Sequence, residues 1–238
     1  MDLKETDILG DRIGEHWYYR SKAQAMARML QGLRPESVLD VGAGSGFFSR
    51  LLLKTTSLRE AWCVDISYDG DSDAVEAGKP IHFRQGIGAN QADLVLLMDV
   101  LEHVDDDVAL LCDYVAKAPS GTHFLISVPA FQALWSAHDV FLEHKRRYTL
   151  PQLESSIHAS GLQIERSAYY FGLVLPLAAT MRLAERLHSG TATQPRSQLS
   201  LHHPVVNRLL SLTCALELPW MRWNRVGGLT AFCLARKP

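Results

Sequence analysis

The sequence contains only four cysteines in 238 residues, and no two of them lie close together. Cys63, Cys112, Cys214 and Cys233 occur in apolar stretches, without the closely spaced pairs that zinc sites use. We therefore expect reduced thiols in the protein core and neither disulfides nor a structural zinc site.

Long hydrophobic runs are also missing. The longest wholly apolar stretch covers residues 171–179, far below the roughly 20 residues that a membrane-spanning helix needs. The first residues show no basic segment followed by an apolar one, so neither an export signal nor a transit peptide is indicated. We expect a cytoplasmic protein that can touch the inner membrane surface but does not cross it.

A strong charge of one sign is absent as well, because 24 basic residues nearly balance 26 acidic ones. This balance provides no global field for nucleic acid, and we expect no nucleic-acid partner. From residue 180 onward, however, basic residues clearly outnumber Glu185 and Glu217. The local excess indicates either a solvated basic face or a surface for an anionic partner.

What is present is an alternation of strand and helix patterns in a chain of ordinary globular composition, 47% hydrophobic and 21% charged. Strands are predicted at residues 37–41, 61–65, 81–85, 92–98, 122–128, 163–170 and 228–235. Helical patterns cover residues 15–33, 47–54, 105–117, 151–160, 173–187 and 205–218. Such alternation is typical of an α/β fold with a mostly parallel sheet and helices on both faces.

The predicted fold is therefore Rossmann-like, with seven strands and a helical insertion before the last strand. Residues 1–34 form an N-terminal helical segment, and residues 35–238 form the main domain. Within that domain, residues 130–150 are predicted to be a substrate loop and residues 173–224 a helical lid. The sequence does not indicate an oligomeric state.

Residues 40–46 read Asp-Val-Gly-Ala-Gly-Ser-Gly between the first strand and its helix. Glycines at alternate positions let the backbone approach a ligand closely, and the N-H groups of the following helix face that ligand. Dehydrogenase turns usually read G-x-G-x-x-G instead, and a carboxylate at Asp40 suits an ammonium group better than a pyrophosphate. The turn predicts a nucleoside cofactor and disfavours a nicotinamide oxidoreductase.

Residues 38–46 resemble the first motif of the class I S-adenosylmethionine-dependent methyltransferases. In addition, Asp65 matches the family's ribose-binding acid, and residues 93–103 resemble its fourth-strand motif. The resemblance implies S-adenosyl-L-methionine as cofactor. The cofactor-binding residues that it implies are Asp40, Gly42, Ala43, Gly44, Gly46, Asp65, Ile66, Met98 and Asp99.

Adenine recognition departs from the family pattern. The family commonly places an acidic residue after the third strand, but residues 85–88 read Gln-Gly-Ile-Gly. Gln85, backbone groups or the nearby Asp69, Asp71 and Asp73 are alternatives, and a solvated acidic loop is another interpretation of these aspartates.

Residues 134–149 lie after the fifth predicted strand, where open α/β sheets place substrate loops. Their pattern, W-x-x-H-D-x-x-x-x-H-x-R-R-Y, resembles a segment of a methyltransferase subgroup associated with glycan and cell-envelope pathways. The predicted substrate-binding residues are Trp135, Asp139, Arg147 and Tyr148. Arg147 is the candidate reader of an anionic group, with an internal salt bridge as the alternative.

A hydroxyl acceptor benefits from a base near neutral pH, and the predicted catalytic residues are His103, His138 and His144. Structural roles, such as helix capping or a hydrogen-bonded lattice in the loop, remain alternatives. His138, Asp139 and His144 could in principle bind a metal, but neighbouring ligands on one loop converge poorly. No metal is expected.

The insertion carries apolar side chains that predict either helix packing or a lid over the acceptor, namely Leu173, Leu177, Met181, Leu209, Leu212 and Leu216. With Trp220 and Trp223, this basic segment could also rest on a membrane surface. We therefore expect methyl transfer to a small-molecule or lipid-linked acceptor, most readily at oxygen. The alternatives are an N- or S-methyltransferase of a metabolite and a non-catalytic cofactor-binding partner protein.

Overall fold

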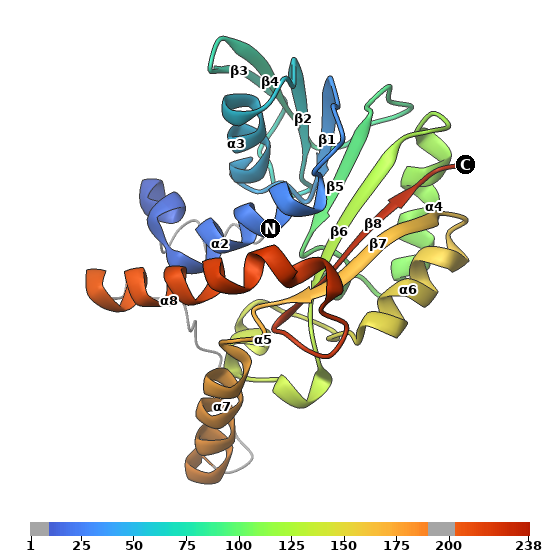
Figure 1. Cartoon of the computed structure of the whole chain (residues 1–238). Coiled ribbons are helices and arrows are strands. Elements are labelled where there is room, and N and C mark those ends of the chain that lie inside the picture. The colour runs from blue at the N-terminus through green and yellow to red at the C-terminus, as the bar shows by residue number, and fades with distance from the viewer. Residues whose placement is uncertain (1–9, 190–202) are drawn as a thin grey trace.

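The computed structural model describes residues 10–189 and 203–238, and its centre is an eight-stranded sheet. The strands are β1 Ser37–Val41, β2 Glu60–Val64, β3 Ser72–Glu76, β4 Lys79–Arg84, β5 Leu94–Met98, β6 His123–Pro129, β7 Gln163–Tyr170 and β8 Thr230–Arg236. Their order across the sheet is β3-β4-β2-β1-β5-β6-β8-β7 (Figure 1). The predicted α/β class and Rossmann-like arrangement are confirmed.

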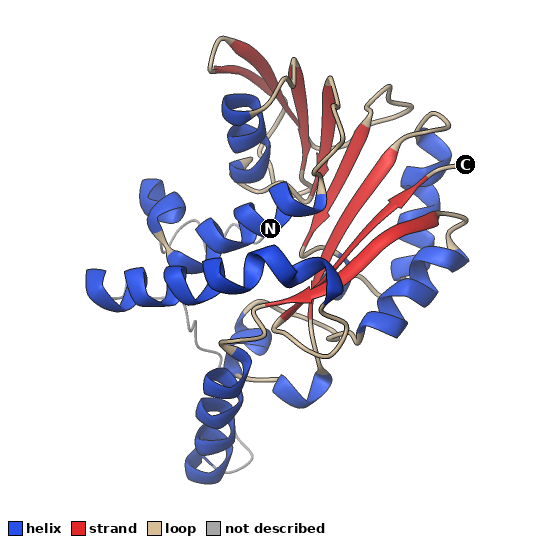
Figure 2. Cartoon of the chain, in the orientation of Figure 1, coloured by secondary structure: helices blue, strands red, loops and turns tan. Residues whose placement is uncertain are grey.

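Helices cover both faces of this sheet (Figure 2). They are α2 Trp17–Met29, α3 Phe47–Thr55, α4 Asp107–Lys117, α5 Ala137–Phe141, α6 Leu150–Ala159, α7 Leu175–Ser189 and α8 Pro204–Glu217. Short 3-10 helices occur at η1 Gly10–Glu15, η2 Leu101–His103, η3 Gln132–Leu134 and η4 Leu218–Trp223. In the order of the chain, helices α7 and α8 come after β7 and before β8, as the sequence predicted. Residues 190–202 of that insertion lie outside the described residues.

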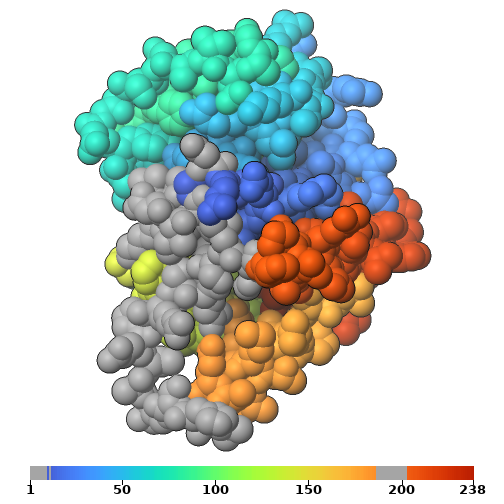
Figure 3. All heavy atoms as spheres, turned by 90° about the vertical axis from the view of Figure 1, so that its left-hand side faces the viewer, coloured from blue at the N-terminus to red at the C-terminus, as the bar shows by residue number. Residues whose placement is uncertain are grey.

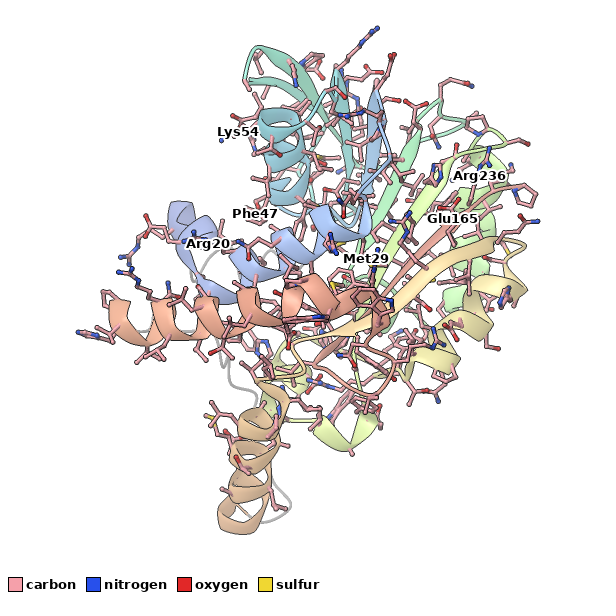
Figure 4. The ribbon with its side chains drawn as sticks, in the orientation of Figure 1. Arg20, Met29, Phe47, Lys54, Glu165 and Arg236 are labelled. Atoms are coloured by element: carbon pink, nitrogen blue, oxygen red, sulfur yellow. The ribbon has the colours of Figure 1, made fainter. Side chains whose placement is uncertain are left out.

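Strand alternation divides the core into two layers. Along β5, Leu94 and Leu96 pack with α2 and α3, whereas Val95 and Leu97 pack with α4 and α6. All four side chains are fully buried, as expected for parallel strands with helices on both faces. Phe47, at the start of α3, lies above α2 (Figure 4), and its ring is 5.8 Å from that of Tyr19.

Strands β4, β2, β1, β5 and β6 run parallel, so their carboxyl ends share one edge of the sheet. Strand β8 is antiparallel to both β6 and β7. Helix α5 follows β6 and α7 follows β7, which brings both helices to this same edge (Figure 1). Open α/β sheets bind ligands at this edge.

The sheet has one strand more than the seven predicted. Strand β3 forms an antiparallel hairpin with β4, and the two residues between them, Ala77 and Gly78, have φ angles of 54° and 77°. Positive φ at both positions is typical of a tight hairpin turn, but Ala-Gly lacks the usual Asn or Asp signal. Because β3 is a charged edge strand, its sequence resembles a solvated acidic loop.

The cysteine expectation is confirmed in part. All four residues are free thiols, and Cys63, Cys214 and Cys233 are buried. Cys112, however, is exposed on α4. The prediction that it is buried, which was based on its apolar neighbours in the sequence, is therefore wrong. Over residues 10–189 and 203–238, no helix is long and apolar enough to cross a membrane.

Gly228 allows the chain to enter β8 directly against β7. A Cβ atom at this position would lie 2.1 Å from the carbonyl oxygen of Tyr170, a backbone atom that has little room to move. We expect Gly228→Ala to lower the free energy of unfolding by about 3 kcal/mol, as overpacking does, in denaturant titrations. Gly88→Ala is the matched control, since no atom lies within 4 Å of its Cβ position, and equal stability of the two variants would contradict the packing argument.

Candidate active site

The glycine turn between β1 and α3 adopts a backbone that other residues rarely adopt. Gly42, Gly44 and Gly46 have φ angles of 64°, 53° and 72°. The Gly42 N-H donates to the carbonyl of Val64 over 2.7 Å, which ties the turn to the end of β2. A Cβ atom on Gly46 would lie 3.2 Å from both Cys63 and Phe83, so the turn has no room there for a side chain.

Asp65 follows β2 directly and is joined to the glycine turn. One carboxylate oxygen accepts from the Gly44 N-H over 3.0 Å, and the other accepts from the Ser67 N-H over 3.0 Å. The Tyr68 hydroxyl donates to the Gly44 carbonyl over 2.6 Å. Beside these residues lies an open hollow of about 600 Å³, lined by Gly44, Tyr68, Asp69, Gly70, Asp71, Ser72 and Phe83.

Two other residues of the predicted cofactor set have contrasting surroundings. Asp40 is buried and accepts a hydrogen bond from the Ser49 hydroxyl over 2.8 Å. Burial raises the pKa of Asp40 to about 6, although the Ser49 hydrogen bond opposes that rise. Ile66 is 93% exposed, so its side chain has almost no protein contact in this structure.

The candidates for adenine recognition are largely engaged within the β3-β4 hairpin. Asp73 contacts His82 Nδ1 over 2.7 Å and Arg84 over 2.8 Å. The side-chain amide of Gln85 donates to the Tyr68 carbonyl over 2.5 Å, and its backbone N-H donates to Asp71 over 3.2 Å. These contacts order the rim of the hollow.

Asp99, just after β5, holds a buried cation that sequence analysis missed. It forms an ion pair with Lys22, whose side chain is fully buried, and accepts from the Ser127 hydroxyl over 3.2 Å. Burial alone would lower the pKa of Lys22, but the charge of Asp99 outweighs it and the pKa is raised. The available signal was a single lysine on the apolar face of the helix at residues 15–33. The φ of Asp99 is 58°, an uncommon conformation for a residue other than glycine.

A buried ion pair organises the loop after β6. Arg147 contacts both carboxylate oxygens of Asp139, with Nε and Nη2 at 2.6 and 2.9 Å, and Nη1 donates to the Ala130 carbonyl over 3.2 Å. Ser136 donates to Asp139 through its backbone and its hydroxyl, and His144 Nδ1 lies 2.9 Å from the same carboxylate. Burial alone would raise the pKa of Asp139, but hydrogen bonds from His144 and Arg147 hold it well below its usual range.

His144 and Tyr148, both in the loop after β6, contact η2. The His103 ring centroid lies 4.8 Å from that of His144, and the planes are nearly perpendicular. The Tyr148 hydroxyl donates to Asp107 over 3.0 Å, in a buried contact that joins the loop to α4. Trp135 and His138 are half-buried at η3 and α5.

Glu102, also in η2, is a second buried charge that sequence analysis missed. Its side chain is inaccessible to solvent, and neither carboxylate oxygen hydrogen-bonds to another residue that the structure describes. Burial, with the nearby charge of Asp99, raises the pKa of Glu102 well above its ordinary value. An acidic residue directly before His103 was the only sequence signal.

Helix α7 contributes Arg182, whose Nη1 is buried and has no hydrogen-bond partner within the described ranges. Burial and the neighbouring charge of Arg147 lower the pKa of Arg182 to about 10. The guanidinium therefore keeps its positive charge near neutral pH. A different hollow, of about 340 Å³ beside Asp93 and His123, lies at the amino ends of the strands, away from all these residues.

A family model described as a methyltransferase domain matches residues 15–167. The chain therefore belongs to this methyltransferase family. The matched range contains the glycine turn, Asp65, Asp99 and the whole loop after β6. This chain is thus a class I S-adenosylmethionine-dependent methyltransferase, as its sequence motifs implied.

Several solved structures share the methyltransferase fold. A chain from the complex of the Haloferax volcanii Trm112 methyltransferase activator with a methyltransferase has a TM-score of 0.58 and 15% identity, covering 99% of this chain and 93% of that one. The N-methyltransferase NodS from Bradyrhizobium japonicum, with bound S-adenosyl-L-homocysteine, has a TM-score of 0.54 and 12% identity, covering 99% and 96%.

The 1,6-didemethyltoxoflavin-N1-methyltransferase of Burkholderia thailandensis, also with bound S-adenosylhomocysteine, has a TM-score of 0.54 and 17% identity, covering 92% and 80%. At such low identity, these likenesses show the fold and not the acceptor. Comparison with curated protein sequences gives no match.

The Asp139-Arg147 pair generates a stability prediction. Arg147→Met would leave the buried carboxylate of Asp139 without its two guanidinium contacts, so we expect the free energy of unfolding to fall by about 3–5 kcal/mol. Arg59→Met, which breaks the exposed pair with Glu36, should cost less than about 1 kcal/mol. Thermal and urea unfolding of both variants measures the difference, and similar small losses would show that Arg147 is not a structural cation.

Proposed function

We propose that this methyltransferase transfers a methyl group from S-adenosylmethionine to an oxygen of a small or amphiphilic acceptor that carries an anionic group. The observation that carries the proposal is the meeting of two sets of residues at the carboxyl edge of the sheet. One set suits a nucleoside cofactor, and the other combines imidazoles with a guanidinium whose buried Nη1 has no hydrogen-bond partner in the described structure.

The cofactor half is assigned to the glycine turn and the residues after β2 and β5, namely Asp40, Gly42, Ala43, Gly44, Gly46, Asp65, Ile66, Met98 and Asp99. The left-handed backbone at Gly42, Gly44 and Gly46 supports this assignment, since a turn without side chains lets a ligand approach closely. Asp65 accepts from two backbone N-H groups and from the Ser67 hydroxyl, and its remaining acceptor capacity is suited to ribose hydroxyls. Bound S-adenosylmethionine supplies an electrophilic methyl group on a sulfonium, and the protein's part is mainly to position the acceptor and exclude water.

Asp65→Asn tests the cofactor assignment. Hydrogen bonds to a charged acceptor contribute about 1.5–3 kcal/mol each, so affinity for S-adenosylmethionine and S-adenosylhomocysteine should fall at least tenfold in calorimetry. Asp113→Asn is the control because Asp113 forms an exposed pair with Lys117 on α4. Unchanged affinity in a folded Asp65→Asn protein, or binding of NAD without a response to either sulfur nucleoside, would contradict the assignment.

The choice of oxygen is supported by the imidazoles at this edge. A hydroxyl must lose its proton when it is methylated, and His103 and His144 lie together beside the end of β5. Asp139 fixes the orientation of His144, as acidic partners do for histidines in many active sites. We assign the acceptor hydroxyl to these two histidines and not to His138, whose ring stacks on Phe141. Nitrogen or sulfur in the methylated product, located by fragmentation mass spectrometry, would refute the choice of oxygen.

The anionic group is assigned to Arg182. Sequence analysis favoured Arg147 for this role, but the guanidinium of Arg147 is engaged with Asp139 and Ala130. Arg182 lies close enough for its charge to act on Arg147, and its buried Nη1 lacks a partner in the described structure. A carboxylate or phosphate on the acceptor would supply that partner.

The apolar part of the acceptor is assigned to α7 and α8. Figure 3 shows α8 on the surface beside α2, with α7 below. Both helices expose large apolar side chains, including Leu177, Met181, Leu183, Val205, Leu209, Leu212 and Leu216. This many exposed large apolar side chains on two neighbouring segments suit an alkyl tail or a membrane surface.

Arg182→Gln tests the anionic assignment against a panel of hydroxylated acceptors that carry a carboxylate or a phosphate, with and without alkyl tails. Loss of a charged hydrogen bond of about 1.5–3 kcal/mol should lower kcat/KM at least tenfold for the anionic acceptor that is used. Cofactor affinity should stay within about threefold, because separate sites contribute nearly additive free energies. Arg208→Gln, an exposed position on α8, is the control. Equal effects of the two variants would remove Arg182 from acceptor recognition.

A further inference from the structure

Three potential metal ligands from two segments of the chain meet at the carboxyl end of β5. Glu102 and His103 lie in η2, and His144 lies after α5. A carboxylate oxygen of Glu102 and one ring nitrogen from each histidine all lie within 4.8 Å of one another. The sequence pattern suggested only neighbouring ligands on one loop, and no metal was expected; the fold brings together a different trio.

At its buried position, Glu102 can ionise only if a positive charge compensates the carboxylate. Lys22, whose charge acts on Glu102, is already paired with Asp99. Glu102 is fully buried, and neither of its oxygens hydrogen-bonds to another residue in the described chain. A buried charge without a partner is strongly unfavourable, and coordination of a metal ion is one of the few ways in which proteins compensate it.

His144 is oriented as a metal ligand would be. Its Nδ1 lies 2.9 Å from Asp139, so the Nδ1 proton is directed to the carboxylate and the lone pair is left on Nε2. Asp139 in turn accepts hydrogen bonds from Nε and Nη2 of Arg147 and from the Ser136 N-H, which fix its position. Carboxylate partners of this kind hold the tautomer and the ring orientation of ligating histidines in most metal sites.

We propose that Glu102, His103 and His144 bind a single divalent transition-metal ion. Two imidazoles and one carboxylate suit Zn²⁺, Mn²⁺, Co²⁺ or Fe²⁺ better than Mg²⁺ or Ca²⁺, which prefer oxygen ligands. Three protein ligands leave coordination positions open, as in catalytic sites. Its contribution to catalysis rests on the proposed function and changes the role of the two histidines there, because a ring nitrogen bound to metal cannot also accept a proton. With the ion present, an acceptor hydroxyl bound to it would lose its proton to water more readily, and its oxygen would then attack the methyl group as the sulfur leaves.

The test measures metal binding without cofactor or acceptor, so its outcome does not depend on the proposed function. Untagged protein is stripped with a chelator and dialysed against Zn²⁺, Mn²⁺ or Co²⁺, and bound metal is measured by mass spectrometry. We expect one ion per chain and a rise in the melting temperature with metal. Visible absorption of the Co²⁺ form should show bands of nitrogen and oxygen coordination.

Glu102→Gln and His144→Ala should each lower the affinity by at least tenfold, because each removes a ligand. His103→Asn, at a half-buried position, provides a third variant that is less prone to unfold. His123→Ala is the control, since His123 pairs with Glu165 at 3.4 Å outside the trio. Wild-type binding no tighter than that of the folded His103→Asn variant, or no binding of any of the three ions, would overturn the proposal.

Cofactor affinity of the same metal-free preparation, measured by calorimetry, separates the two ideas. Retained S-adenosylmethionine binding without metal binding would leave the methyltransferase assignment intact and remove the metal site. Metal binding together with a product methylated at nitrogen would keep the site and remove its role at a hydroxyl.

Discussion

The hydrogen bond between the Gly44 N-H and Asp65 joins the two connections on which the cofactor half of the site depends. The first connection is the glycine turn after β1, and the second is the turn after β2. Parallel strands bring both turns to one edge, but only the left-handed backbone of the glycines lets them approach within hydrogen-bond distance. The Gly42 contact with Val64 and the Tyr68 contact with Gly44 reinforce the same junction.

The acceptor half depends instead on buried charge. Lys22 is paired with Asp99, and Arg147 is paired with Asp139. In each pair, the opposite charge offsets most of the free-energy cost of burying the ionised side chains. The first pair fixes α2 against the end of β5, and the second holds the loop after β6 together and ties it to Ala130. Among the charged side chains that the structure describes, the carboxylate of Glu102 and Nη1 of Arg182 are buried without a hydrogen-bond partner. Because a fold rarely retains such groups without compensation, they are the strongest indications of what the site binds.

The motif-bearing elements were predictable because their signals are local. Strand β7 has the predicted bounds, and Thr149 caps α6 through a hydrogen bond with Gln152, as its sequence pattern indicated. The glycine turn was recognisable for a similar reason, since its conformation demands particular residues at particular positions. Strand β3 was missed because its turn is Ala-Gly and its side chains are charged, so neither local signal was present.

The sequence by itself therefore determined the α/β class, the family and the position of the cofactor turn, because these depend on periodicity and on contiguous motifs. Tertiary structure alone decided the partners of the charged residues. Lys22 and Asp99 are 77 positions apart, and Glu102 meets His144 from a different connection. It also placed Arg147 on Asp139 and left Nη1 of Arg182 without a hydrogen-bond partner among the described residues. Pairing between distant charges depends on which strands are neighbours and on how deeply each side chain is buried, and neither property is encoded in a short segment of sequence.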